Sequence, residues 1–257
     1  MELFSREYGE GPPLILLHGI FGISDNWVTV GKRIAGLGYH VIIPDQRNHG
    51  RSPHSPAFNY YALVDDLTEF VDAHGIESPI LMGHSMGGKV AMRYILENPD
   101  MVSGLIAVDV SLRTYVVHHQ HRELIDAMKS ADPGRARSRS DVEAQLKERI
   151  KSERIRLFLM KNLFWKDHDR LGWRLNLRAL EENLESMYDG VFYSTQYRGP
   201  ALFIKGGNSD YISEDDKPDI LEKFPRARIE TIPGATHWVH ADAPEAFFSL
   251  VSDFLSD

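Results

Sequence analysis

The sequence predicts an α/β protein with a mostly parallel central sheet, flanking helices and a helical lid inserted before the last strands. Short apolar runs alternate with amphipathic helical segments over the first 110 residues, and this rhythm returns after residue 200. Between these regions, charged helical segments replace the strand-like runs. Continuous apolar strands that alternate with helices are typical of a parallel sheet covered on both faces. We therefore expect a core of residues 1–111 and 195–257 and a lid of residues 112–194.

Six short runs have the length and composition of strands. They are Leu14–Leu17, Val41–Ile43, Ile80–Met82, Leu105–Val108, Ala201–Ile204 and Arg228–Ile232. The clearest helix follows the second run, because Asn59 can cap its start and Gly75 can end it. Between them, Leu63, Leu67 and Phe70 recur at helical spacing, with acidic residues on the opposite side. A terminal helix is expected from Pro244.

Four segments of the lid are predicted to be helical, at residues 122–129, 141–150, 155–164 and 174–188. Near the end of the third segment, five apolar side chains recur at helical spacing. They are Phe158, Leu159, Leu163, Phe164 and Trp165. These side chains either pack the lid onto the core or roof an apolar acyl pocket.

His118, His119 and His121 form a local cluster at the start of the lid. A metal site would need a matching carboxylate–histidine arrangement, and none is evident in the sequence. We expect these three histidines to lie on the solvated surface.

The composition excludes several classes of protein. The 257 residues include no cysteine, which excludes disulfides, a thiolate nucleophile and cysteine-ligated metals. Acidic residues outnumber basic ones by 37 to 29, and the formal charge of −8 disfavours a nucleic-acid partner. The first residues lack a signal-peptide pattern, and no run approaches the ~20 apolar residues of a membrane span. We expect a cytoplasmic protein without a membrane partner, and the oligomeric state stays open.

The strongest chemical signal is the run Gly83-His84-Ser85-Met86-Gly87, which follows a predicted strand and precedes a predicted helix. A serine between two glycines on such a turn is the pattern of a nucleophile elbow. Larger side chains at positions 83 and 87 would collide with the neighbouring strand and helix. The helix N-terminus favours the negative charge that develops on an attacked carbonyl, and Met86 supplies one backbone N–H for it. The alternative is a tight glycine-rich turn with an inert serine.

A second signal is the turn that begins with His18-Gly19, directly after the first predicted strand. A loop at this point of the chain can provide the other N–H of an oxyanion hole. Ile20 is the favoured donor, and Phe21 is the alternative. Without the serine turn, the same residues would predict only a turn after a strand.

A serine nucleophile needs a base that is itself oriented by an acid. In chains with such a nucleophile elbow, the serine comes first, the acid second and the histidine last. His237 fits this order, because it lies on a loop between the last predicted strand and the last helix. Two aspartates, Asp109 and Asp210, follow predicted strands between Ser85 and His237. Their spacing does not separate them, and either could instead cap a turn.

Together these motifs resemble the α/β-hydrolases and, among them, small bacterial acyl-ester hydrolases of the YbfF type. The resemblance covers the chain from Glu2 to the C-terminus. It is carried by HGIFGISDNW at 18–27, DQRNHGRS at 45–52, GHSMGGK at 83–89, VDVS at 108–111, GGNS at 206–209 and GATHWVHAD at 234–242. In that group the acid comes from the position matching Asp109, so the resemblance favours this residue, although here Asp210 is also acidic. It further implies that Asp45 and Arg47 tie loops together near the site.

The expected activity is that of a serine hydrolase that cleaves carboxylic esters of short to medium acyl chains, with thioesters as a related class. The reaction passes through an acyl-enzyme and needs no metal or organic cofactor. Serine in the elbow excludes the chemistry of dehalogenases and epoxide hydrolases, which use an aspartate there. The alternatives are a cofactor-free perhydrolase, a carbon–carbon bond hydrolase and, from another class, a non-catalytic ligand receptor.

Overall fold

The computed structural model describes residues 1–116 and 119–256, apart from the side chain of His119. Its main sheet has seven strands in the order β1-β3-β2-β4-β5-β8-β9, and every pair is parallel except β1 with β3. The strands are β1 (Ser5–Tyr8), β2 (Pro13–Leu17), β3 (His40–Pro44), β4 (Ile80–His84), β5 (Gly104–Val108), β8 (Ala201–Gly206) and β9 (Ala227–Ile232). All six predicted strands lie within this sheet, which confirms the predicted fold class.

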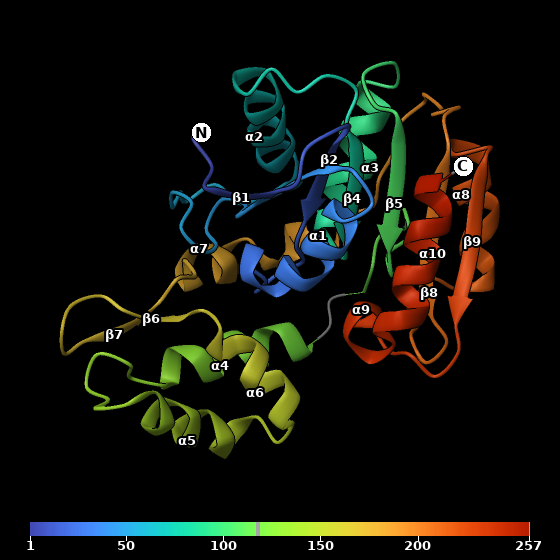
Figure 1. Cartoon of the computed structure of the whole chain (residues 1–257). Coiled ribbons are helices and arrows are strands. Elements are labelled where there is room, and N and C mark those ends of the chain that lie inside the picture. The colour runs from blue at the N-terminus through green and yellow to red at the C-terminus, as the bar shows by residue number, and fades with distance from the viewer. Residues whose placement is uncertain (117–118, 257) are drawn as a thin grey trace.

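Alternate residues of each buried strand point to opposite faces of the sheet. Leu14 and Leu16 pack in one apolar cluster, and Ile15 and Leu17 pack in the other. Figure 1 shows the helices that cover the two faces. One face carries α1 (Val28–Ala35), α9 (Val239–Asp242) and α10 (Pro244–Ser256), and the other carries α2 (Tyr60–Ala73), α3 (Met86–Glu97) and α8 (Lys217–Lys223).

The insertion between β5 and β8 lies near the carboxyl ends of the parallel strands (Figure 1). It contains α4 (His119–Ser130), α5 (Arg139–Arg149), α6 (Glu153–Met160), β6 (Leu163–Trp165), β7 (Leu171–Trp173) and α7 (Leu177–Glu182). Active sites of open parallel sheets lie at this end, so the insertion stands where it can cover one.

Two elements of the insertion differ from the sequence prediction. The segment predicted as one helix over 174–188 forms α7 and a separate 3-10 helix, Leu184–Tyr188. The helix predicted over 155–164 ends at Met160, and the next residues pair as the antiparallel strands β6 and β7. Asn162 breaks the helix because its side-chain amide donates to the carbonyl of Phe21 in the core, at 2.8 Å. A contact across the molecule therefore overrides the local helical periodicity.

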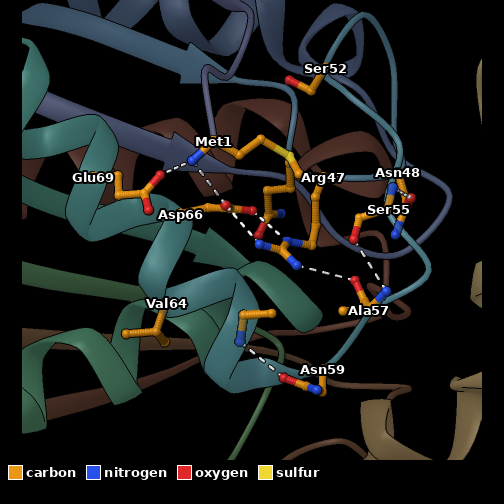
Figure 2. Close-up of polar contacts among 12 residues, drawn as sticks. Met1, Arg47, Asn48, Ser52, Ser55, Ala57, Asn59, Val64, Asp66 and Glu69 are labelled. Carbon is orange, nitrogen blue, oxygen red and sulfur yellow. Dashed lines mark hydrogen bonds and ion pairs between the residues drawn. The ribbon is translucent and has the colours of Figure 1, made fainter.

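The loop after β3 fastens the core to the start of the chain, as Figure 2 shows. The Arg47 guanidinium donates to both carboxylate oxygens of Asp66 on α2, at 2.5 and 2.8 Å. The N-terminal ammonium of Met1 contacts Asp66 and Glu69. Asp45 accepts the backbone N–H of Ser24 at 2.6 Å. These bonds confirm the expected loop-tying role of Asp45 and Arg47.

Candidate active site

Ser85 occupies a strained turn between β4 and α3. Its φ of 52° and ψ of −119° lie in a region that residues other than glycine rarely adopt. A Cβ atom at position 83 would lie 2.3 Å from the carbonyl oxygen of Gly87, and one at position 87 would lie 2.4 Å from that of Leu17. Both glycines are therefore required sterically, which agrees with the reason that the sequence pattern suggested.

Asp109, at the end of β5, faces His237. The two side chains meet at 2.8 Å, between Nδ1 of His237 and Oδ2 of Asp109. Asp109 is fully buried and accepts two further bonds, from the backbone N–H of Gly206 at 2.9 Å and from the Ser209 hydroxyl at 2.5 Å. Donation from Nδ1 leaves Nε2 of a neutral imidazole free to accept a proton.

Asp210 lies close by but is oriented differently. It is exposed, and its backbone carbonyl accepts a bond from the Arg113 guanidinium at 2.6 Å. Among the described residues, no hydrogen bond joins Asp210 to His237. Of the two candidate aspartates, the structure thus brings only Asp109 to the histidine.

Two aromatic rings hold the imidazole of His237. Tyr211 stacks on it at 3.8 Å between ring centroids with an interplanar angle of 16°, and the His84 ring lies at 4.6 Å. Nε2 of His84 donates to the backbone carbonyl of His237 at 2.9 Å. Burial lowers the pKa of His84 well below its ordinary value, so this ring stays neutral. Tyr211 could not be identified from the sequence, because an aromatic residue in a loop matches no motif.

The loop after β2 passes directly beside the serine, since a Cβ atom on Gly19 would lie 3.3 Å from Cβ of Ser85. In this loop the N–H of Phe21 donates to Nε2 of His49 at 3.3 Å. Burial lowers the pKa of His49 to about 3, and its Nδ1 lies 2.8 Å from the carbonyl of Arg47. The neutral ring thus donates from Nδ1 and accepts at Nε2. The Phe21 N–H is already engaged, which favours Ile20 as the candidate oxyanion donor with Met86, the first residue of α3.

A cavity of about 710 Å³ opens in front of Ser85 and His237. Pockets of about 300–1,000 Å³ accommodate small organic ligands. The insertion contributes part of the wall through residues of α4 and α6. Another part comes from the 3-10 helix η1 (Ser24–Trp27) and from α1, α9 and α10. Among the lining residues are Trp27, Val30, Leu124, Leu157, Phe158 and Phe248.

The five apolar residues predicted near the end of the third lid helix have different locations. Phe158 lines the cavity, whereas Leu159 and Leu163 are buried in the core and Trp165 is exposed. Phe164 lies in β6 with the Arg174 guanidinium over its ring at 4.6 Å. Of the five side chains, Phe158 thus borders the cavity, and Leu159 and Leu163 contribute to the apolar packing.

The expectation of a solvated surface is wrong for His121. This residue lines the cavity, and its Nδ1 lies 2.7 Å from the Tyr188 hydroxyl, because the start of α4 folds over the site. His118 and the side chain of His119 lie outside the described residues. Within the described part of the chain, no three metal-ligating side chains gather in one place. Nor does any helix of that part have the length and apolar character needed to cross a membrane.

Comparisons with known proteins agree with this geometry. The family model described as "alpha/beta hydrolase fold" matches residues 12–244. The sn-1-specific diacylglycerol lipase ABHD11 of Danio rerio is 40% identical over 252 residues, which cover 96% of this chain and 79% of that protein. Esterase YbfF of Escherichia coli strain K12 is 35% identical over 245 residues, covering 95% and 93%. A solved structure titled "Marine microorganism esterase" superposes with a TM-score of 0.95 at 40% identity, covering 98% of this chain and 99% of that one. The chain thus belongs to the α/β-hydrolase family and is a hydrolase of the carboxylesterase type.

Proposed function

We propose that Ser85, His237 and Asp109 form the catalytic triad of this ester hydrolase, with the amides of Met86 and Ile20 as its oxyanion hole. The observation that carries the proposal is the bond of 2.8 Å between buried Asp109 and His237, at the same cavity as Ser85. The alternatives Asp210 and Phe21 have less support. Asp210 has no bond to the histidine among the described residues, and the Phe21 amide already has an acceptor.

In the proposed reaction, Oγ of Ser85 attacks the ester carbonyl while Nε2 of His237 takes the serine proton. Charge accumulates on the carbonyl oxygen, where the two amides donate to it. His237 returns its proton to the leaving alcohol, and the acyl group stays on Ser85. Water then attacks the acyl-enzyme with His237 again as base, which releases the acid and restores the serine. Throughout, Asp109 keeps the imidazole in the tautomer that has its proton on Nδ1.

The proposed substrates are carboxylic esters with short to medium acyl chains, with thioesters as the related class. Residues 112–194 act as a lid in this proposal, because α4 and α6 contribute walls of the cavity. The proposed partner is a small-molecule ester in the cytoplasm, and the excess of 37 acidic over 29 basic residues disfavours nucleic acid.

The initial rate on p-nitrophenyl esters from acetate to palmitate tests this proposal. The wild type should be fastest on the short acyl chains, and Ser85→Ala should abolish the rate. Ser103→Ala provides the matched control, since Ser103 is exposed and lines neither cavity that borders Ser85. An equal rate in wild type and Ser85→Ala would refute the proposed nucleophile. Turnover of a peracid or a carbon–carbon substrate without ester cleavage would favour the perhydrolase or carbon–carbon hydrolase.

A further inference from the structure

In the part of the chain that the structure describes, two cavities of very different size border Ser85. The large one is the cavity of about 710 Å³ described above. The second has a volume of about 20 Å³ and is lined by Ile20, Ser85 and Met86 together with residues that include Lys89 and Met187. An ester bound to Ser85 therefore has one large and one very small space available for its acyl group and its alcohol.

The positions of the proposed catalytic groups indicate which cavity holds the alcohol and which holds the acyl group. His237 lines the large cavity and not the small one, and Met86, a proposed oxyanion donor, lines the small cavity and not the large one, while Ile20 lies between them and lines both. His237 must protonate the leaving alcohol, and a general acid has to lie within hydrogen-bond reach of the atom that it protonates. The alcohol thus lies on the His237 side, in the large cavity. The acyl substituent then points past Met86 into the small one.

The size of the small cavity limits the acyl group. The cavity's volume of about 20 Å³ is far below the volume of about 710 Å³ of the large cavity, so this space admits only a short acyl group. Medium or long acyl chains do not fit without a rearrangement of the wall.

Hydrogen bonds hold that wall in place. The Tyr60 hydroxyl donates to the backbone carbonyl of Met187 at 2.9 Å. Nζ of Lys89, which is 1% exposed, donates to the carbonyls of Arg113 at 2.8 Å and Tyr188 at 3.4 Å. These bonds tie the two ends of the insertion to α2 and α3. A longer acyl chain would need room in a wall whose backbone these bonds hold in place.

We propose that the small cavity is the acyl site and that this enzyme cleaves acetyl-sized esters of larger alcohols. The inference rests on the proposed function, because it uses His237 as the acid for the leaving group. It narrows that function, since the alcohol is then the larger part of the substrate and the acyl group the smaller part.

Two isomeric esters, octyl acetate and ethyl octanoate, test the assignment at constant size and hydrophobicity. Acid release is followed by titration for the wild type and Ser85→Ala. We expect kcat/KM for octyl acetate to exceed that for ethyl octanoate by more than tenfold, since a single methylene that a pocket rejects can change the rate about tenfold. Equal rates, or faster cleavage of ethyl octanoate, that depend on Ser85 would overturn this inference alone. Failure of both esters, with no difference from Ser85→Ala, would overturn the proposed function as well.

Truncation of the wall gives a second test. Met187→Ala should enlarge the small cavity while keeping the backbone carbonyl that Tyr60 binds. The ratio of butanoate to acetate cleavage on p-nitrophenyl esters should rise about tenfold. Met160→Ala is the matched control, because Met160 is also a buried methionine of the insertion but lines neither cavity. If Met187→Ala fails to fold, Val110→Ala replaces it, since Val110 lines the small cavity too. An unchanged ratio in a folded variant would show that the acyl group lies elsewhere.

Discussion

The turns after β5 and β8 both carry an aspartate, and their surroundings differ. Asp109, after β5, is fully buried and accepts bonds from His237, Gly206 and Ser209. Asp210, after β8, is exposed and contributes its backbone carbonyl to Arg113. A buried carboxylate that accepts several hydrogen bonds is held in one orientation, whereas an exposed one is free to rotate. In the proposed site, the turn after β8 contributes through the Ser209 hydroxyl, which donates to Asp109, and not through the carboxylate of Asp210.

The most direct test of this difference is to remove each of the two carboxylates in turn. Asp109→Asn should lower kcat on p-nitrophenyl acetate by about 10⁴-fold, because an amide cannot stabilise the imidazolium or hold its tautomer. Asp210→Asn should change kcat by less than about threefold, as expected for an exposed side chain. The reverse pattern would make Asp210 the acid. Losses of similar size in both variants would point to unfolding, which thermal melting curves would reveal.

The contribution of the turn after β8 can be measured at Ser209. Its hydroxyl donates to Oδ2 of Asp109, the oxygen that also faces His237. Ser209→Ala should lower kcat about tenfold, since a hydrogen bond to a charged group contributes about 1.5 kcal/mol. Ser213→Ala is the matched control because its hydroxyl contacts another carboxylate, that of Asp216, at 2.8 Å. Equal activity in wild type and Ser209→Ala would show that the turn after β8 does not support Asp109.

The buried ring of His49 makes the stability of the fold depend on pH. His49 is fully buried, and burial lowers its pKa from the ordinary 6.5 to about 3. Between those values the unfolded chain binds a proton that the folded chain excludes, so the free energy of unfolding falls as the pH falls below about 6.5. From pH 6.5 to pH 5 this loss amounts to about 2 kcal/mol for the one group.

Chemical unfolding of the wild type and His49→Gln at pH 7 and pH 5 checks this expectation. The substitution should reduce the difference in unfolding free energy between the two pH values by about 2 kcal/mol. His168→Gln is the control, because His168 is exposed and should leave that difference unchanged. If His49→Gln leaves the difference unchanged as well, His49 is not the neutral buried ring that binds the Phe21 amide.

The parts of the site that could be predicted from sequence are those fixed by local sterics. The glycines around Ser85 are required by contacts within one turn and the adjoining strand, so their spacing in the sequence is sufficient to predict the elbow. His237 is placed by the order of strands and helices along the chain.

The choice between Asp109 and Asp210 could not be predicted from their spacing, because it depends on how two distant turns meet. Gly206 and Ser209 lie about a hundred positions from the aspartate to which they donate. The same reason explains the hairpin β6–β7, where Asn162 ends a helix through a bond to the core. Strand β1 was not predicted either, since its residues Ser5–Tyr8 lie at a sheet edge and include no apolar run.

The smallest change in kcat is expected at Tyr211, the aromatic residue that follows Asp210 in the turn after β8. Its ring stacks on His237, and its backbone carbonyl accepts a bond from the Tyr115 hydroxyl at 2.8 Å. Tyr211→Ala removes a stacked pair that contributes about 1 kcal/mol, so kcat should fall about fivefold. Tyr211→Phe keeps the ring and should restore kcat, which distinguishes stacking from a role of the hydroxyl group. Equal losses in both variants would assign the effect to the hydroxyl, and no loss in either would mean that Asp109 alone orients His237.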